Sequence, residues 1–173
     1  DLNSKAPSMG VKKFPITENS EFPIQTSFYG SSKLAAEAFI SSYCEGYDFQ
    51  SWIFRFVSIL GPKYSHGHVF DFYKKLLKDQ TILNVLGNGL QRKSYLHIQD
   101  CISAVLKSVK TFDDKINIIN IGHDEYINVK KSVKIITNHL KLNPKILYSS
   151  NESRGWIGDN SFIFLSNKNH SIL

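Results

Sequence analysis

The sequence holds few of the residues that build metal sites or disulfide frameworks. It has two cysteines, Cys44 and Cys101, which fall inside predicted helices and show no CxxC spacing. We expect both to be buried thiols in a reducing compartment, which favours a cytoplasmic protein. The six histidines show no recurring ligand spacing, and acidic residues do not cluster with them. The sequence therefore predicts no metal site.

Long hydrophobic runs and clusters of basic residues are also missing. No apolar run approaches the roughly 20 residues of a membrane helix, so no membrane association is expected. The net charge is +6, but the lysines are spread along the chain rather than grouped with aromatic residues. This distribution argues against a nucleic-acid surface and remains compatible with a small ligand that carries a diphosphate.

Helical and strand-like patterns alternate along the chain, which predicts an α/β protein with some parallel pairing. The expected helices span about 27–47, 68–79, 101–110 and 129–140. The expected strands span about 52–57, 82–86, 95–98, 116–121 and 146–148. Asp100 is expected to cap the third helix. No internal repeat or low-complexity linker interrupts residues 1–173, which favours a single unit.

Tyr29 and Lys33 form the most informative pair in the chain. They are four residues apart in Tyr29-Gly-Ser-Ser-Lys33, so they share one face of the first expected helix. A nearby ammonium favours the ionised form of a phenol. The spacing therefore predicts a pair that can transfer a proton.

Further blocks of sequence follow one another in a fixed order around this pair. They are Phe14-Pro-Ile-Thr-Glu18, Tyr29 to Glu37, Phe54-Arg-Phe with Leu60-Gly-Pro62, Gly87 to Asp100, and Gly155-Trp-Ile-Gly-Asp159. Over about residues 10–168 this order resembles the extended short-chain dehydrogenase/reductase superfamily. The resemblance is strongest to its NAD-dependent nucleotide-sugar epimerase/dehydratase family.

The resemblance implies catalytic roles for residues at the start of the chain. Tyr29 would exchange a proton with a sugar hydroxyl, and Lys33 would favour its phenolate form and hydrogen-bond the nicotinamide ribose. The family also uses a Ser or Thr just before a Tyr-Gly dipeptide. Aligning that glycine with Gly10 puts Lys5 at the Ser/Thr position, with Ser4 adjacent. Either Ser4 serves in that role, or the first residues depart from the family pattern.

The resemblance also implies residues that bind the substrate, a nucleotide-diphosphate sugar. Lys93 stands where the family offers an arginine to the diphosphate, and Arg92 lies beside it. Ser58 replaces an asparagine that contacts the substrate. Arg154 and Asp159 would lie near the diphosphate and the nucleotide ribose.

The implied fold is the C-terminal part of a Rossmann-like doubly wound sheet with a small substrate-binding lobe. The cofactor, NAD or NADP, would be bound mainly by an N-terminal half that carries a glycine-rich phosphate loop. Only 28 residues precede Tyr29, and they contain no such loop. We therefore expect the dinucleotide-binding half to be absent and the 173-residue chain to be inactive alone.

The resemblance implies an epimerase and leaves three alternatives open, namely a dehydratase, a reductase and a non-catalytic relative. Dehydratases of the family carry an acidic pair where this chain has Ala6-Pro7, which favours an epimerase or a reductase over a dehydratase. The third alternative is a non-catalytic relative that binds a sugar nucleotide or a partner. The resemblance further implies a homodimer formed through the helix that carries Tyr29 and Lys33.

Overall fold

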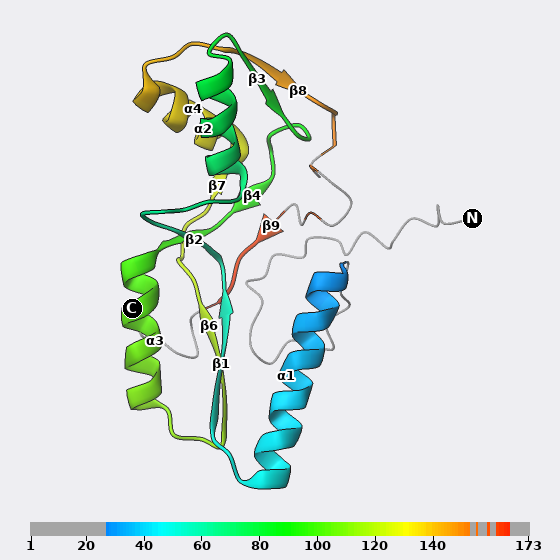
Figure 1. The fold of residues 1–173 in the computed structure, drawn as a ribbon, viewed down its shortest axis with the longest axis vertical. Coiled ribbons are helices and arrows are strands. Elements are labelled where there is room, and N and C mark those ends of the chain that lie inside the picture. Colours follow the sequence, from blue (N-terminus) through cyan, green and yellow to red (C-terminus); the bar gives the residue numbers. More distant parts are fainter. Residues whose placement is uncertain (1–26, 153–154, 156–158, 160–161, 167–173) are drawn as a thin grey trace, which may run out of the picture.

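The computed structural model describes residues 27–152, 155, 159 and 162–166, which form four helices and nine strands (Figure 1). The helices are α1 (Phe28–Tyr47), α2 (His68–Lys78), α3 (Ile98–Thr111) and α4 (Val129–Leu140). The strands are β1 (Ser51–Phe56), β2 (Ser58–Leu60), β3 (Ile82–Val85), β4 (Arg92–Lys93), β5 (Tyr95–His97), β6 (Ile116–Ile121), β7 (Ile127–Asn128), β8 (Lys145–Tyr148) and β9 (Phe162–Ile163). The described part of the chain is thus mixed α/β, as predicted.

The lower lobe in Figure 1 consists of a parallel strand pair between two helices. β1 pairs with β6 along six residues, α1 lies on one side of the pair, and α3 lies on the other. Ile53 on β1 and Ile119 on β6 are buried, as expected where helices cover both faces of a parallel sheet. Asn120, also buried on β6, donates from its Nδ2 atom to the Ser166 carbonyl at 3.2 Å. This bond attaches the last described residues to the lobe.

The upper lobe has a separate apolar core. β3 and β8 pair in parallel, and α2 and α4 pack against each other beside them. Its core includes Phe72 and Leu76 of α2, Leu83 and Val85 of β3, and Val133 of α4. Phe72 and Leu76 are four residues apart on α2, and Leu83 and Val85 are two residues apart on β3. These spacings place each pair on one face of its helix or strand.

A small sheet lies between the two lobes. β4 is its central strand, paired antiparallel with β7 and parallel with β9. β2 and β5 form a further parallel pair, in which Ser58 lies opposite Tyr95. These short strands bring residues from both lobes and from the end of the chain to one place.

The helix expected from residue 101 begins earlier than predicted. α3 starts at Ile98, and its N-cap is His97, whose Nδ1 atom accepts a hydrogen bond from the Gln99 amide at 3.3 Å. The prediction of Asp100 as the cap was therefore wrong. Asp100 lies in the first turn, where a carboxylate interacts favourably with the helix dipole.

The structure bears on the other predictions made from composition. Cys44 and Cys101 are both buried and unpaired, which confirms that they are buried thiols. None of the helices described is long and apolar enough to span a bilayer. Within the described residues, no cluster of His, Cys, Asp and Glu could hold a metal ion.

Leu76 provides a test of the upper core. Its side chain is completely buried, whereas that of Leu77, the next residue on α2, is 61% exposed. We expect Leu76→Ala to lower the free energy of unfolding by about 2–5 kcal/mol because it leaves a cavity. Leu77→Ala is the control and should change it by no more than about 0.5 kcal/mol. Equal losses in urea denaturation would show that α2 does not pack as described.

Candidate functional site

Tyr29 and Lys33 lie one turn apart near the start of α1. Ser27 caps the helix, and its hydroxyl accepts a hydrogen bond from the Gly30 amide at 3.1 Å. The Lys33 ammonium is 5.2 Å from the centre of the Tyr29 ring. The Tyr29 side chain is 72% exposed. The pair therefore has the expected i, i+4 geometry, and its phenol is open to a ligand.

An ion pair attaches this helix face to the sheet. Glu37 continues the same face by one more turn, and Arg55 lies on β1. The guanidinium donates twice to the carboxylate, at 3.0 Å from Nε and 2.6 Å from the terminal nitrogen. Both side chains are mostly buried, so this two-bond contact fixes the rotation of α1 about its axis. It holds the helix that carries Tyr29 and Lys33 against β1.

A cavity of about 330 Å³ lies between the two lobes. Ser58, Lys93 and Asp159, three of the predicted substrate residues, all line it. They come from β2, β4 and the segment before β9, which are distant in sequence. Aromatic side chains of α2, β5 and the β2–α2 loop form much of the remaining wall.

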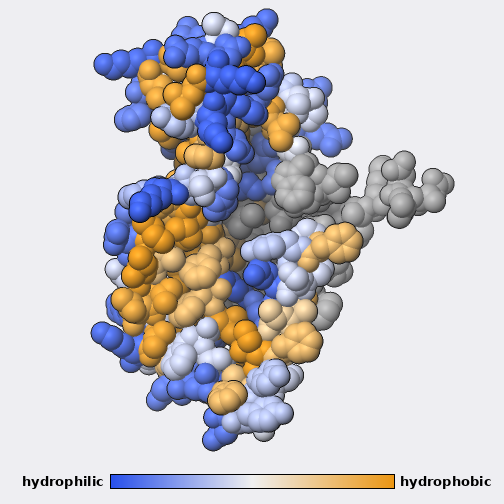
Figure 2. Space-filling model, viewed as in Figure 1, coloured by the Kyte–Doolittle hydropathy of each residue, from blue (hydrophilic) through white to orange (hydrophobic). Residues whose placement is uncertain are grey.

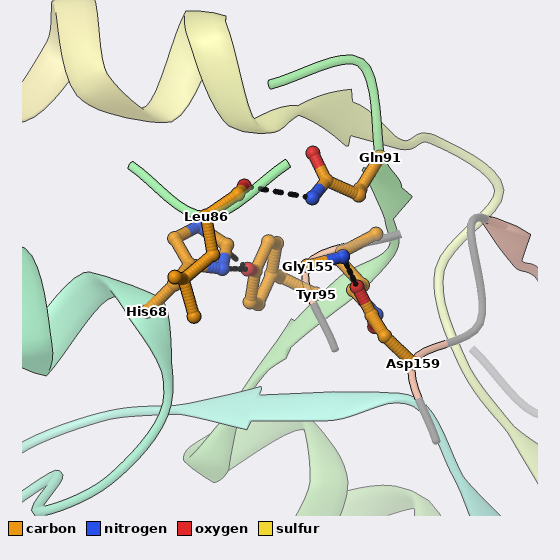
Figure 3. A network of polar contacts seen from close by, with 7 residues as sticks. His68, Leu86, Gln91, Tyr95, Gly155 and Asp159 are labelled. Atoms are coloured by element: carbon orange, nitrogen blue, oxygen red, sulfur yellow. Dashed lines mark hydrogen bonds and ion pairs between the residues drawn. The ribbon is translucent and has the colours of Figure 1, made fainter. Parts of the chain in front are cut away.

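Lys93 and Asp159 form an ion pair at the wall of this cavity. The Lys93 ammonium donates to Asp159 at 2.7 Å, and the Gly155 amide donates to the other carboxylate oxygen at 3.0 Å (Figure 3). The two charged side chains are only 16% and 11% exposed. An ammonium and a backbone N–H thus converge on one carboxylate, as they would on an oxygen of a bound anion.

Arg92 points to the other face of β4. Successive residues of a strand alternate between its faces, so Arg92 and Lys93 diverge. The Arg92 guanidinium is 4.5 Å from the centre of the Phe162 ring and 5.3 Å from that of Tyr126. It is not among the residues that line the cavity in the described part of the chain.

A hydrogen-bonded pair of rings lies on the cavity wall. The Tyr95 hydroxyl is 3.1 Å from the His68 ring nitrogens (Figure 3). Burial is the main cause that lowers the pKa of His68, to about 4, and the positive charge of Lys93 adds to it. Burial also raises the pKa of Tyr95, with a further contribution from Tyr64. Both groups are therefore neutral near pH 7.

His68 should make stability depend on pH. Between about pH 6.5 and 4 the unfolded chain binds a proton at this histidine and the folded chain does not. The free energy of unfolding should therefore fall as the pH falls through this range, by up to about 1.4 kcal/mol per pH unit. His68→Gln should flatten this slope, and His66→Gln, at an exposed nearby position, is the control. Parallel slopes for wild type and His68→Gln in denaturation curves would contradict the assignment.

Two other predicted site residues, Tyr29 and Lys33, do not line this cavity. Ser4 and Arg154 are outside the described residues. Sequence reasoning missed Gln91 and Tyr95, although a signal was available. They are two residues before and two residues after Lys93, and all three line the cavity. Alternation of side chains along an extended segment could have pointed to them.

The fold defines a Rossmann-type α/β protein, and a cavity lined by the Lys93–Asp159 ion pair lies beside its sheet. Residues 6–122 match the model of the NAD dependent epimerase/dehydratase family. The chain belongs to this family.

Curated relatives and solved structures agree with this assignment. The chain is 33% identical to mouse dTDP-D-glucose 4,6-dehydratase over 76% of its own length and 36% of the relative's. It is 29% identical to an uncharacterised UDP-glucose epimerase of Bacillus subtilis, covering 73% of this chain and 40% of that protein. A crystal structure of UDP-galactose 4-epimerase matches with a TM-score of 0.80 and 26% identity, over 92% of this chain and 50% of that one. The chain therefore spans between about a third and a half of the length of these three proteins.

Proposed function

We propose that this chain belongs to a longer enzyme that epimerises a nucleotide-diphosphate sugar with NAD or NADP. The observation that carries the proposal is the Lys93–Asp159 cavity, in a family chain that also holds Tyr29 and Lys33 in i, i+4 geometry. Solved structures of similar fold include a UDP-glucuronic acid 4-epimerase of Bacillus cereus in complex with UDP-glucuronic acid and NAD. A ligand of the same class suits a cavity that combines buried cationic, hydroxyl and aromatic groups.

The cavity residues bind and orient the substrate in this proposal. Lys93 exchanges its contact with Asp159 for the diphosphate, and the Gly155 amide donates to the same group. Ser58 offers a hydroxyl to the sugar, and Asp159 turns to the nucleotide ribose. Arg154 adds a second cation near the diphosphate, as the family resemblance implies.

Tyr29 moves the proton in the reaction. Its exposed phenol lies near an ammonium, so it can take a proton from a sugar hydroxyl and return it. Lys33 stabilises the phenolate and hydrogen-bonds the ribose of the cofactor. The bound cofactor supplies the hydride chemistry at the sugar carbon. These residues fit a nicotinamide, whereas the chain has no GxGxxG sequence for the pyrophosphate. We assign that part of the cofactor to an N-terminal half of the longer protein.

A second copy of the protein packs against α1 in this proposal. Phe39, Tyr43 and Tyr47 of that helix are each more than half exposed. The lower lobe also shows a strongly apolar area on its α3 side, whereas its α1 side is paler (Figure 2). Faces of this kind mark contacts with other protein surfaces. We therefore propose a homodimer formed through α1, in a protein that acts in the cytoplasm.

The second candidate function is that of a dehydratase, favoured by the 33% identity to mouse dTDP-D-glucose 4,6-dehydratase. Ala6-Pro7, where dehydratases of the family carry an acidic pair, favours the epimerase. The test is to incubate the full-length protein with NAD or NADP and UDP-glucose, UDP-galactose or dTDP-glucose, and to identify the products. An epimer supports the proposal, and loss of water from the sugar supports the dehydratase. Binding of the sugar nucleotide without any conversion would mean a non-catalytic relative.

A further inference from the structure

Arg92 has a packing role that its neighbour Lys93 does not share. Its guanidinium lies over Phe162 at 4.5 Å and near Tyr126 at 5.3 Å, on the face of β4 that points away from the cavity. Tyr126 contacts Phe162 edge to face, with ring centres 5.2 Å apart. Phe162 stacks on Phe164 at 5.9 Å. We call Arg92 and these three rings the Arg92 stack.

The Arg92 stack joins all three strands of the small sheet. Arg92 is on β4, Tyr126 directly precedes β7, and Phe162 begins β9. Among the described residues, β9 pairs with β4 at two positions, Phe162 opposite Arg92 and Ile163 opposite Lys93. A parallel ladder of two residues is too short to fix a strand by itself. The side-chain stack therefore adds to the Asn120–Ser166 hydrogen bond and to the buried Leu165 in holding β9 in this register.

The position of β9 determines where Asp159 lies. Asp159 precedes Phe162 by three residues and reaches Lys93 at 2.7 Å on the cavity side of the sheet. One face of β4 thus carries the stack and the other carries the ion pair, and both act on the same short segment. If β9 separated from β4, Asp159 and the Gly155 amide would leave the cavity wall.

We propose that Arg92 is a positioning residue for the diphosphate site. It acts through Phe162 and β9 and does not touch the ligand, in contrast to the role that its place beside Lys93 implied. This inference rests on the proposed function, because it takes the Lys93–Asp159 cavity as the site of a nucleoside diphosphate. It adds that a surface stack on the opposite face of the sheet controls affinity at that site.

Binding of UDP to the full-length protein tests the inference. Arg92→Ala and Phe162→Ala should each weaken UDP binding by about 3- to 30-fold, the range that one cation–π contact supports. The double variant should lose little more than either single variant, because both changes break the same contact. Arg92→Met should keep most of the affinity, since a thioether also packs on aromatic rings. If Arg92 instead contacts the diphosphate, Arg92→Met should lose as much as Arg92→Ala, and Phe162→Ala should bind normally.

Hydrogen exchange separates positioning from general destabilisation. In Arg92→Ala the amides of β9 should exchange faster, while those around Leu76 in the upper core keep their wild-type rates. Faster exchange in both regions, or in neither, would overturn the inference. The proposed function fails separately: wild-type protein would not bind UDP, or Lys93→Met would bind it normally. The first of these results would also remove the basis of the positioning role.

Discussion

Replacing Tyr29 by phenylalanine is expected to lower kcat of the full-length enzyme by about 10²- to 10⁴-fold, the usual contribution of a general acid–base. The substitution removes only the hydroxyl, so the ring remains available to the Lys33 ammonium that lies 5.2 Å from its centre. KM for the sugar nucleotide should change little, because the proposed diphosphate site is at Lys93, outside the Tyr29–Lys33 pair. Steady-state kinetics with the sugar nucleotide that the enzyme converts provides the measurement.

Tyr43→Phe is the matched control for this experiment. Tyr43 is on the same helix, is also more than half exposed, and stacks on Tyr47 rather than near a cation. The same hydroxyl is removed there, while the ring that stacks on Tyr47 and faces the proposed partner copy is kept, so no loss of kcat is expected. A Tyr29→Phe enzyme with wild-type kcat would exclude Tyr29 as the acid–base. Equal losses in both variants would indicate damage to α1 or to its contacts.

The regular elements of the fold could be predicted from local sequence. The helix expected over 27–47 is α1 with Ser27 as its cap, and the strand expected over 116–121 is β6. Such elements have a clear hydrophobic period over many residues. The short strands β2, β4, β7 and β9 were not predicted. Two or three residues carry no period, and their pairing depends on partners far away in sequence.

The candidate site shows the same division between local and distant contacts. Tyr29 and Lys33 are four residues apart on one helix, so the sequence alone predicted that their side chains share a face. The ion pair of Lys93 with Asp159 joins residues 66 positions apart. The family resemblance implied that both residues bind the substrate, but it could not show that their side chains form an ion pair. Nor could it show that Arg92, adjacent to Lys93, packs on Phe162 at the other face.

Contacts between α1 and the sheet link the helix of Tyr29 and Lys33 to the cavity at Lys93 and Asp159. Glu37 and Arg55 connect the helix of Tyr29 to β1, whose partner β6 is bonded through Asn120 to Ser166. Ser166 follows β9, the strand whose position sets Asp159. A continuous series of contacts therefore runs from the Tyr29–Lys33 pair to the cavity at Lys93 and Asp159. In the proposed function, these contacts would keep the acid–base and the diphosphate site in a fixed relation.

Removing the Lys93 charge should have the largest effect on ligand binding. We expect Lys93→Met to weaken UDP binding by about 10- to 100-fold, because hydrogen bonds to charged groups contribute about 1.5–3 kcal/mol. The same change leaves the Asp159 carboxylate, 11% exposed, without its cationic partner. The thermal midpoint should therefore fall as well, since breaking a buried ion pair is destabilising. Isothermal titration below the new midpoint isolates the effect on affinity.

Two further variants make this result specific. Lys93→Arg keeps the cation and adds a planar fork that can grip two phosphate oxygens, so UDP should bind at least as tightly as to the wild type. Lys75 also lines the cavity, but it is exposed and its ammonium donates to the Asn84 carbonyl at 2.9 Å. Lys75→Met makes the same chemical change and should weaken binding by less than about threefold, in keeping with an exposed charge. Equal losses from Lys75→Met and Lys93→Met would mean that the cavity attracts UDP by its overall charge. A loss confined to Lys93→Met would mean that the diphosphate binds to the buried Lys93 ammonium, which the register of β4 places in the cavity wall.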